Sequence, residues 1–530
     1  MQRRQFLAAA SASAAMPALS MPALAQNSAA RTLRFVPQAN LSSLDPIWTT
    51  ATVTRNYALM VFDTLYGLDE HLVPSPQMVE GHTVENDGLR WTMKLRDGLV
   101  FHDGAPVLAR DCVASLTRWM KRDPVGQSLA SRMDALEAPD DRTLVFRLKK
   151  PFASLPFALA KAQPSPPCIM PARIAATDPF KQITEVVGSG PFRYVASEFV
   201  SGSLAVFAKF DAYKPREETP SFTAGARRAM FDRIEWRVIP DPSTAANALI
   251  SGEVDWLEIP IPDLVPLLRK SRDVVVDRLD PIGLYPVLRP NAMHGPTANK
   301  GVRQAILAAI DQKEMMQAVM GDDPATYHLP TGCFLPGTES WTDAGLDKLG
   351  PKSPEVVRRM LKEAGYNNEK LLLMHPTDQP FYDAMSQVAA STLTKCGFNI
   401  DDAAMDWGTV VQRRASKQPL NAGGWSLFCT SFPAADYLDP LSAAALRGNA
   451  GDAWYGWPAN PKLEQLRESW LDATDPAERK KLTAAIQVEA LDNAQVIPLG
   501  QYFQSAAWRR GLTGFLKGPA PVFWNVRKGS

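Results

Sequence analysis

The side chains that most often carry out catalysis are scattered along this 530-residue sequence. No stretch has the spacing of a G-x-S-x-G nucleophile elbow, a Walker A loop, a G-x-G-x-x-G dinucleotide loop or an H-E-x-x-H zinc motif. The histidines lack the spacing of metal ligands; they are His71, His82, His102, His294, His328 and His375. We therefore predict a protein that is not an enzyme and carries no metal or cofactor. A secreted hydrolase stays an alternative, because a triad of distant residues leaves no local motif.

The neighbouring residues His102 and Asp103 could transfer protons on residue type alone. They stand in the run Phe101-His102-Asp103-Gly104, and an Asp-Gly pair favours a turn. The helix predicted over residues 109–120 follows directly, so Asp103 could cap its first turn. We interpret the pair as a structural turn and not as a catalytic one.

Five cysteines give the chain no disulfide framework and no C-x-x-C motif. They are Cys112, Cys168, Cys333, Cys396 and Cys429. Cys333 and Cys429 could pair with each other after export. All five could equally be buried free thiols that act as small apolar residues.

The N-terminus predicts export. Arg3 and Arg4 precede a Phe-Leu pair and an Ala-rich apolar stretch, which is similar to a twin-arginine signal. The run Ala23-Leu24-Ala25 is a small-x-small cleavage site. No later segment offers about 18 uninterrupted apolar residues. We predict a signal peptide over residues 1–25, cleaved after Ala25, and a periplasmic mature protein.

Charge and size narrow the class of protein further. Lys and Arg number 57 against 56 Asp and Glu, so losing Arg3 and Arg4 with the signal leaves the mature chain near −1. A nearly neutral chain has no electrostatic footprint for nucleic acid or for anionic lipid. A mature chain of about 505 residues exceeds the size of a single core, which predicts two or more lobes.

Strands alternate with helices along the chain, which predicts an α/β protein. The period-two alternation of Trp91, Met93 and Leu95 indicates a strand, and a proline-rich segment at residues 284–296 indicates a crossing between lobes. Residues 151–171 are also proline-rich and are predicted to be irregular. The predicted strands are 32–36, 89–95, 144–148, 192–195, 234–239, 254–259, 371–374 and 398–400. The predicted helices are 54–66, 109–120, 244–251, 301–310, 354–364, 382–396, 461–470 and 476–491.

One stretch carries a family resemblance. It runs Gly88-Leu89-Arg90-Trp91-Thr92-Met93-Lys94-Leu95-Arg96-Asp97-Gly98, then Phe101-His102-Asp103-Gly104, Pro106 and Ala109-Arg110-Asp111. Shorter echoes follow the same order along the chain: 43–46, 188–192, 248–255, 302–306, 364–366, 424–425 and 438–440. Together these segments resemble the ABC-transporter extracellular solute-binding proteins of the dipeptide and oligopeptide family (family 5).

The resemblance implies an α/β, two-lobed periplasmic binding protein fold of type II, with a hinge and an extra subdomain in the first lobe. We expect lobe I over residues 26–290 with an inserted subdomain at about 67–186, lobe II over 291–494, and a return to lobe I over 495–530. The implied function is to capture a small peptide-like or organic-acid solute between the lobes, for an ABC permease in the inner membrane. We expect a monomer that binds no nucleic acid.

The resemblance also implies ligand-binding residues in the second lobe. The matching tryptophan, Trp407, flanks the ligand in peptide receptors, and the arginine seven residues later, Arg414, can hold a carboxylate through two parallel hydrogen bonds. The alternative for Arg414 is a solvated helix face. Gly424 and Trp425 match an element in which bare backbone approaches the ligand beside an aromatic wall. The alternative for Trp425 is ordinary core packing.

The sequence departs from peptide receptors three residues after Trp425. Those receptors place an aspartate there for the peptide ammonium, whereas this chain has Phe428. Asp436 could take that role if residues 428–435 are an insertion. Otherwise an ammonium beside Phe428 would be unpaired at a cost of several kcal/mol, and the ligand is a modified peptide, an aromatic acid or another organic anion without a free N-terminus. We favour this second alternative, because a strand-end position is harder to shift than a loop.

Three further residues complete the predicted site. Thr50 follows the Leu-Asp-Pro turn where the family lines its cleft, Arg289 could anchor an anion, and either Tyr502 or its neighbour Gln501 could face the cleft. His375 is expected to be structural. A nickel or metallophore receptor of the same fold remains an alternative that metal content would test, and a chaperone-like binder of long peptides is a lesser one.

Overall fold

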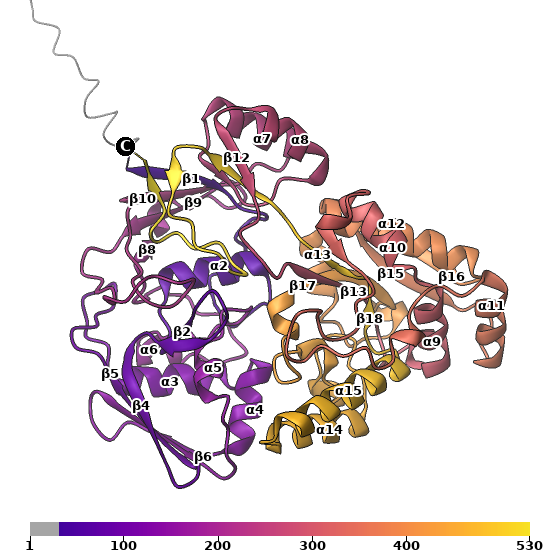
Figure 1. The fold of residues 1–530 in the computed structure, drawn as a ribbon, viewed down its shortest axis with the longest axis horizontal. Helices are drawn as coiled ribbons and strands as arrows, with labels where there is room; N and C mark the ends of the chain where they lie inside the picture. Colours follow the sequence, from indigo (N-terminus) through magenta and orange to yellow (C-terminus); the bar gives the residue numbers. More distant parts are fainter. Residues whose placement is uncertain (1–30, 530) are drawn as a thin grey trace, which may run out of the picture.

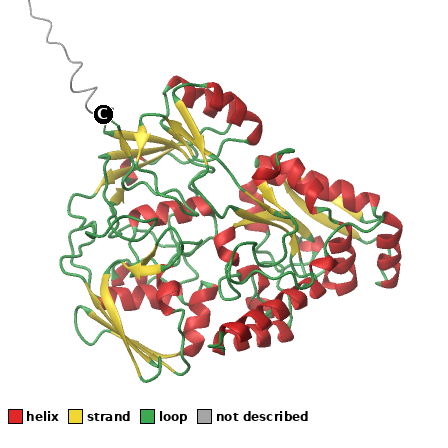
Figure 2. Ribbon diagram, viewed as in Figure 1, coloured by secondary structure: helices red, strands yellow, loops and turns green. Residues whose placement is uncertain are grey.

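The computed structural model describes residues 31–529, so the predicted signal peptide and its cleavage site lie outside the described residues. Two large sheets and one smaller sheet stand apart in Figure 2, and many of the helices gather around the second large sheet. Within the described part of the chain, no helix has both the length and the apolar character needed to cross a membrane.

The first large sheet is mixed and has seven strands in the order β12-β20-β11-β1-β10-β9-β8. In β1, Leu33 and Phe35 are fully buried, and β1 runs parallel to both β10 and β11. The strands are β1 (Thr32–Val36), β8 (Phe192–Tyr194), β9 (Leu204–Lys209), β10 (Arg233–Arg237), β11 (Trp256–Leu257), β12 (Val274–Asp277) and β20 (Ala506–Arg509). Its helices are α2 (Thr52–Val61), α7 (Pro242–Ser251) and α8 (Val265–Lys270). A C-terminal strand, β20, thus lies between β11 and β12, which precede it by more than 200 residues in the chain.

The segment between β1 and β8 carries a four-stranded antiparallel sheet in the order β4-β5-β7-β6. Trp91, Met93 and Leu95 of β5 are buried, as their alternation predicted. The strands are β2 (Tyr66–Leu68), β3 (Pro74–Pro76), β4 (Val79–Glu85), β5 (Arg90–Leu95), β6 (Met133–Glu137) and β7 (Thr143–Leu148). The helices are α3 (Ala109–Trp119), α4 (Pro124–Arg132), α5 (Leu155–Ala160) and α6 (Ala172–Ala175).

The second large sheet has the order β14-β19-β13-β17-β15-β16, with β18 also paired to β13. Its strands are β13 (Leu284–Pro290), β14 (Tyr327–His328), β15 (Lys370–Pro376), β16 (Asn399–Met405), β17 (Leu427–Pro433), β18 (Ile497–Pro498) and β19 (Gln501–Tyr502). Its helices are α9 (Lys300–Ala309), α10 (Gln312–Met320), α11 (Pro354–Glu363), α12 (Pro380–Lys395), α13 (Trp407–Arg413), α14 (Pro461–Asp472) and α15 (Pro476–Asn493). The tail ends in a small hairpin of β21 (Leu512–Thr513) and β22 (Arg527–Lys528).

Sheet membership moves the lobe boundaries from those we predicted. β13 pairs with β17 on one side and with β18 and β19 on the other, so residues 284–290 belong to the second lobe. The chain crosses between the lobes at residues 278–283 and returns at 503–505, instead of at 290 and 494. Pro286 and Pro290 misled the prediction: each lacks an amide donor, but the strand tolerates both within its ladder. Figure 1 shows the yellow C-terminal chain running from the second sheet to the first.

Two predicted elements in the first lobe were also wrong. The helix predicted to reach Tyr66 ends at Val61, because Phe62 is extended and Tyr66 begins β2. The segment predicted to be irregular contains α5, whose Leu155 and Leu159 are fully buried. All five cysteines are buried free thiols, so Cys333 and Cys429 are not paired.

Candidate ligand-binding site

Arg414 is the cation at the centre of the candidate site. It follows α13 directly as its C-cap and is only 3% exposed. The guanidinium carbon lies 4.9 Å from the ring centroid of Tyr455, 5.6 Å from that of Trp407 and 5.8 Å from that of Trp454. Aromatic faces attract a cation in this distance range. We call Arg414 and these three rings the arginine box.

Arg414 has polar neighbours but no carboxylate to balance its charge among residues 31–529. Its Nη2 donates to Oγ1 of Thr50, 3.2 Å away in the other lobe, and its Nε is buried without a hydrogen-bond partner. Among residues 31–529 no acidic side chain forms an ion pair with it. Burial lowers the pKa of Arg414, and the phenol groups of Tyr455 and Tyr382 offset part of that change. A buried guanidinium with a free donor suits a ligand anion.

Local sequence explains how α13 presents this arginine. The Asp406 carboxylate caps the helix by accepting from Thr409 N at 2.9 Å. Trp407 is half-buried in the first turn, with its ring 4.7 Å from that of Tyr382 on α12. The solvated helix face that we considered for Arg414 is therefore wrong.

Trp425 and Gly424 contact the backbone that carries the arginine box and not an open ligand space. Trp425 is 1% exposed, and its Nε1 donates to the Arg414 carbonyl at 3.2 Å. Trp425 is thus packed in the core, which is the alternative that we considered for it. Its hydrogen bond to the Arg414 carbonyl holds the C-terminal end of α13 in place. Gly424 is needed because a Cβ there would overlap the backbone of Gln418 and Pro419, so the close approach is to the protein's own chain.

Phe428 closes the same apolar layer. It is fully buried in β17, and its ring lies 4.9 Å from that of Trp425 and 5.9 Å from that of Trp454. It therefore packs against Trp454 of the arginine box and offers a ligand no charge of its own.

Asp436 faces the first lobe from a short 3₁₀ helix, η7 (Ala434–Tyr437). It is 8% exposed, and its Oδ1 is buried without a hydrogen-bond partner. Burial raises the pKa of this carboxyl to about 7, while the cations Lys161 and Arg55 act in the opposite direction. Both cations belong to the first lobe, so Asp436 lies at the boundary between the lobes.

Sequence reasoning missed several buried polar residues near the lobe boundary, of which Gln163 and Arg55 lie close to Asp436. Gln163 donates through Nε2 to the Ala435 carbonyl at 3.2 Å, and its own Oε1 is buried without a partner. Arg55 lies on α2 and hydrogen-bonds Asn56. Burial lowers the pKa of Arg55, and the negative charges of Glu258, Asp436 and Asp280 offset part of that change. Burial also raises the pKa of Glu258 to about 7 and that of Asp280 to about 6. No motif marks these residues; only their convergence in space does.

Arg289 does not serve as an anion anchor. It is fully buried and donates to four backbone carbonyls at 2.6–3.1 Å. The accepting residues are Ala445, Trp454, Tyr455 and Gln495. A guanidinium has five N–H donors, so almost nothing remains for a ligand. Arg289 holds the chain behind the arginine box in place.

Tyr502 and His375 also have structural partners. Tyr502 is 1% exposed, its hydroxyl lies 3.1 Å from Ser431 Oγ, and its ring stacks on Phe381. His375 bridges two carboxylates, with Nδ1 at 2.8 Å from Asp402 and Nε2 at 2.6 Å from Asp383. His375 is thus structural, as expected.

The His102–Asp103 turn is structural, but it works differently from our prediction. His102 is held between the backbones of Gly188 and Gly190, and burial lowers its pKa to about 4. Asp103 accepts from Ala105 N within its own turn. The helix α3 is capped instead by Asp111, which reaches back to Leu108 N at 2.9 Å.

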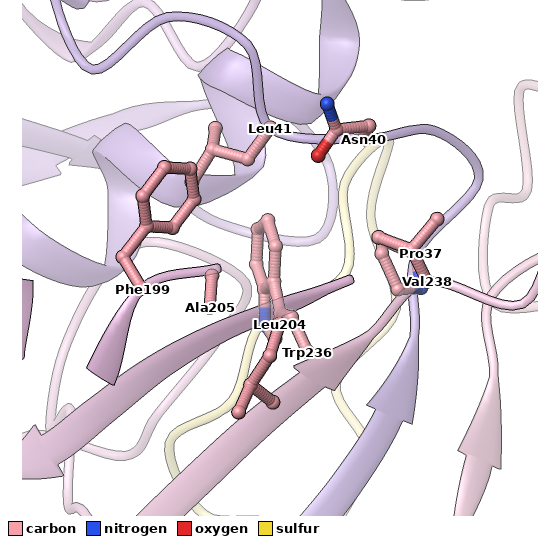
Figure 3. A pocket seen from close by; sticks show the side chains of 8 residues that line it. All are labelled: Pro37, Asn40, Leu41, Phe199, Leu204, Ala205, Trp236 and Val238. Carbon is pink, nitrogen blue, oxygen red and sulfur yellow. The ribbon is translucent and has the colours of Figure 1, made fainter. Parts of the chain in front are cut away.

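Two other features of the described residues bear on ligands. A hollow in the first lobe lined by Leu41, Phe199 and Trp236 (Figure 3) has no room for a water-sized sphere, so it is not a ligand site. Within residues 31–529 no group of three or more His, Cys, Asp or Glu side chains is placed to hold a metal ion.

Comparison with known proteins agrees with this geometry. Residues 73–452 match the model of the bacterial extracellular solute-binding proteins, family 5. A probable peptide ABC transporter periplasmic-binding protein of Sinorhizobium fredii is 37% identical over 524 residues, covering 97% of both chains. The glutathione-binding protein GsiB of Escherichia coli K12 is 27% identical, covering 90% of both. The structure of AgaA from A. tumefaciens R10, in complex with agropinic acid, superposes with a TM-score of 0.79 at 22% identity, covering 94% of this chain and 99% of that one.

Two α/β lobes joined by two crossings, together with the match to the family model, define a non-catalytic solute-binding protein of the periplasmic type. The chain belongs to the bacterial extracellular solute-binding proteins, family 5, and its relatives are periplasmic binding proteins of ABC importers. The family resemblance and the fold predicted from the sequence are thereby confirmed.

Proposed function

We propose that this protein captures a small zwitterionic solute between its two lobes and delivers it to an ABC permease. The observation that carries the proposal is the buried Arg414 guanidinium, which reaches Thr50 of the other lobe and has no carboxylate partner among residues 31–529. A ligand carboxylate placed there would pair with Arg414 and touch both lobes. Such a ligand would favour the closed arrangement over the open one.

Asp436 supports a second charge on the solute. Its Oδ1 and the Oε1 of Gln163 are buried acceptors without a hydrogen-bond partner, so each could accept a hydrogen bond from an N–H group. An ammonium or amide group of the ligand would supply it. We therefore propose that the ligand ammonium binds at Asp436, while Phe428 stays fully buried against Trp454 and out of reach of the ligand. A peptide with a free N-terminus is then the better candidate.

The relatives support the same chemical class. A peptide transporter's binding protein, a glutathione-binding protein and a receptor solved with agropinic acid all resemble this chain. Peptides and glutathione carry both a carboxylate and an amino group. We propose further that the mature protein is a periplasmic monomer, released after cleavage behind Ala25.

Native mass spectrometry of the purified mature protein tests this function, followed by denaturation and identification of any released molecule. A co-purified solute with a carboxylate and an amino group would support the proposal. A neutral solute would contradict it, and a nickel chelate, seen also in the metal content, would favour the metallophore alternative. If the protein is empty, thermal-shift screening of peptides and organic acids follows, in which only carboxylate-bearing compounds should stabilise the protein.

A further inference from the structure

A second set of contacts joins the two lobes through α4 of the inserted subdomain and α14 of the second lobe. Arg132 at the end of α4 places Nη2 at 2.7 Å from both Glu468 and Asp472 of α14. Lys150 lies 3.3 Å from the same Glu468 carboxylate and 3.6 Å from that of Asp472. We call this cluster of four side chains the α4–α14 clasp.

The cation of the clasp is buried, whereas its two carboxylates are partly exposed to solvent. The Arg132 side chain is only 2% exposed, and its Nη1 also donates to the Pro151 carbonyl at 3.1 Å. The Glu468 and Asp472 side chains are 48% and 47% exposed. If α14 moved away, the guanidinium of Arg132 would keep one carbonyl and lose both carboxylates. Separation therefore exchanges two ion pairs for hydration by water, whereas contact keeps both, so the clasp favours contact by the net free energy of these pairs.

A further contact joins the other end of α4 to the second lobe. Arg447 donates to Oε1 of Gln127 at 2.7 Å. Gln127 and Arg132 both lie on α4, so this helix is held at two points by chain segments of the second lobe. In Figure 1, α4 and α14 lie in the lower half of the view, whereas the chain crosses between the sheets in its upper half.

We infer that the α4–α14 clasp sets the balance between open and closed lobes from a position outside the ligand site, with Arg132 as its buried cation and Glu468 and Asp472 as its counter-charges. This inference rests on the lobe closure of the proposed function. The clasp would make part of the closing free energy electrostatic and independent of the solute. Its residues contribute to affinity without touching the ligand, because affinity scales with the population of the binding-competent state.

The test uses the full mature protein, without ligand, carrying the pair Thr50→Cys and Arg414→Cys at the lobe boundary. A short bis-maleimide joins the two thiols only while the lobes are closed, so the cross-linking rate reports closure even when the closed state is rare. The native cysteines are all buried. The rate is measured with and without the further pair Glu468→Gln and Asp472→Asn, whose exposed positions leave the fold intact, as circular dichroism verifies.

The matched control is Glu355→Gln with Glu363→Gln, which removes the same two charges from α11 of the same lobe. Their partners there, Arg358 and Arg359, lie on α11 itself. We expect the clasp variant to cross-link roughly three- to tenfold more slowly than the parent, and the control to match the parent. At 1 M NaCl, where the Debye length falls to about 3 Å, the parent should slow toward the clasp variant.

Two results would overturn the inference. Equal rates for the clasp variant and the control would show that the clasp does not bias closure, although cross-linking itself would still demonstrate that the lobes close. A complete lack of cross-linking in every background would show that the ligand-free lobes do not close, which overturns the clasp, while closure with the solute is tested separately by scattering. Lys150→Gln gives a second measurement with a smaller charge change, and it should slow closure less than the α14 pair does.

Discussion

At the scale of single residues, Arg414 carries the prediction with the largest expected effect. Arg414→Ala should weaken the binding of the carboxylate solute by about 1.5 to 3 kcal/mol, because a charged hydrogen-bond donor is lost. Arg414→Lys should recover only part of this, since an ammonium cannot form two parallel bonds. Isothermal titration calorimetry with the identified solute measures both. Arg358→Ala on α11 is the control, and unchanged affinity in Arg414→Ala would remove this residue from the site.

Asp436 predicts how stability depends on pH. Its folded-state pKa of about 7 lies above its ordinary value of 3.8, so the folded protein binds a proton more readily than the unfolded chain does between these values. Stability of the ligand-free protein should therefore fall as pH rises from about 4 to about 7. Asp436→Asn should lessen this fall and stabilise the ligand-free protein by about 1 to 3 kcal/mol at pH 8. Urea unfolding at pH 5.5 and pH 8 measures it, and parallel curves for both proteins would contradict the assignment.

At the scale of elements, Arg289 joins β13 to chain segments that are remote in sequence. Arg289→Ala should destabilise the protein by about 3 kcal/mol or more, because four buried carbonyls lose their donor. Burial lowers the pKa of this guanidinium to about 10, so it stays charged at neutral pH. Urea unfolding measures the loss, while the affinity of the folded fraction for its solute should change little. A large loss of affinity at wild-type stability would return Arg289 to the ligand site.

Elements with a strong local pattern could be predicted from the sequence, whereas contacts between distant segments could not. The alternation of Trp91, Met93 and Leu95 fixed β5, and the left-handed Gly252 ended α7 where we expected it. Proline misled us at Pro286, because strand membership depends on neighbours that local sequence does not name. The site divides in the same way: Arg414 came from family resemblance, whereas Gln163 is marked only by its unpartnered oxygen.

At the scale of the whole molecule, the two crossings at residues 278–283 and 503–505 predict a hinge motion. Small-angle X-ray scattering should give a smaller radius of gyration with the identified solute than without it. Arg414→Ala at the same solute concentration should show less compaction, because fewer molecules are liganded. Identical scattering of the wild-type protein with and without a saturating, verified ligand would contradict the hinge.

The position of β20 in the first sheet has a consequence for biosynthesis. β20 pairs with β11 on one side and with β12 on the other, although it begins only at Ala506. During synthesis, β20 is therefore made only after nearly all of the chain. Until it is made, β11 and β12 each keep an unpaired edge that is open to aggregation. The lobe synthesised first is completed last, so chains truncated ahead of Ala506 should be prone to aggregate.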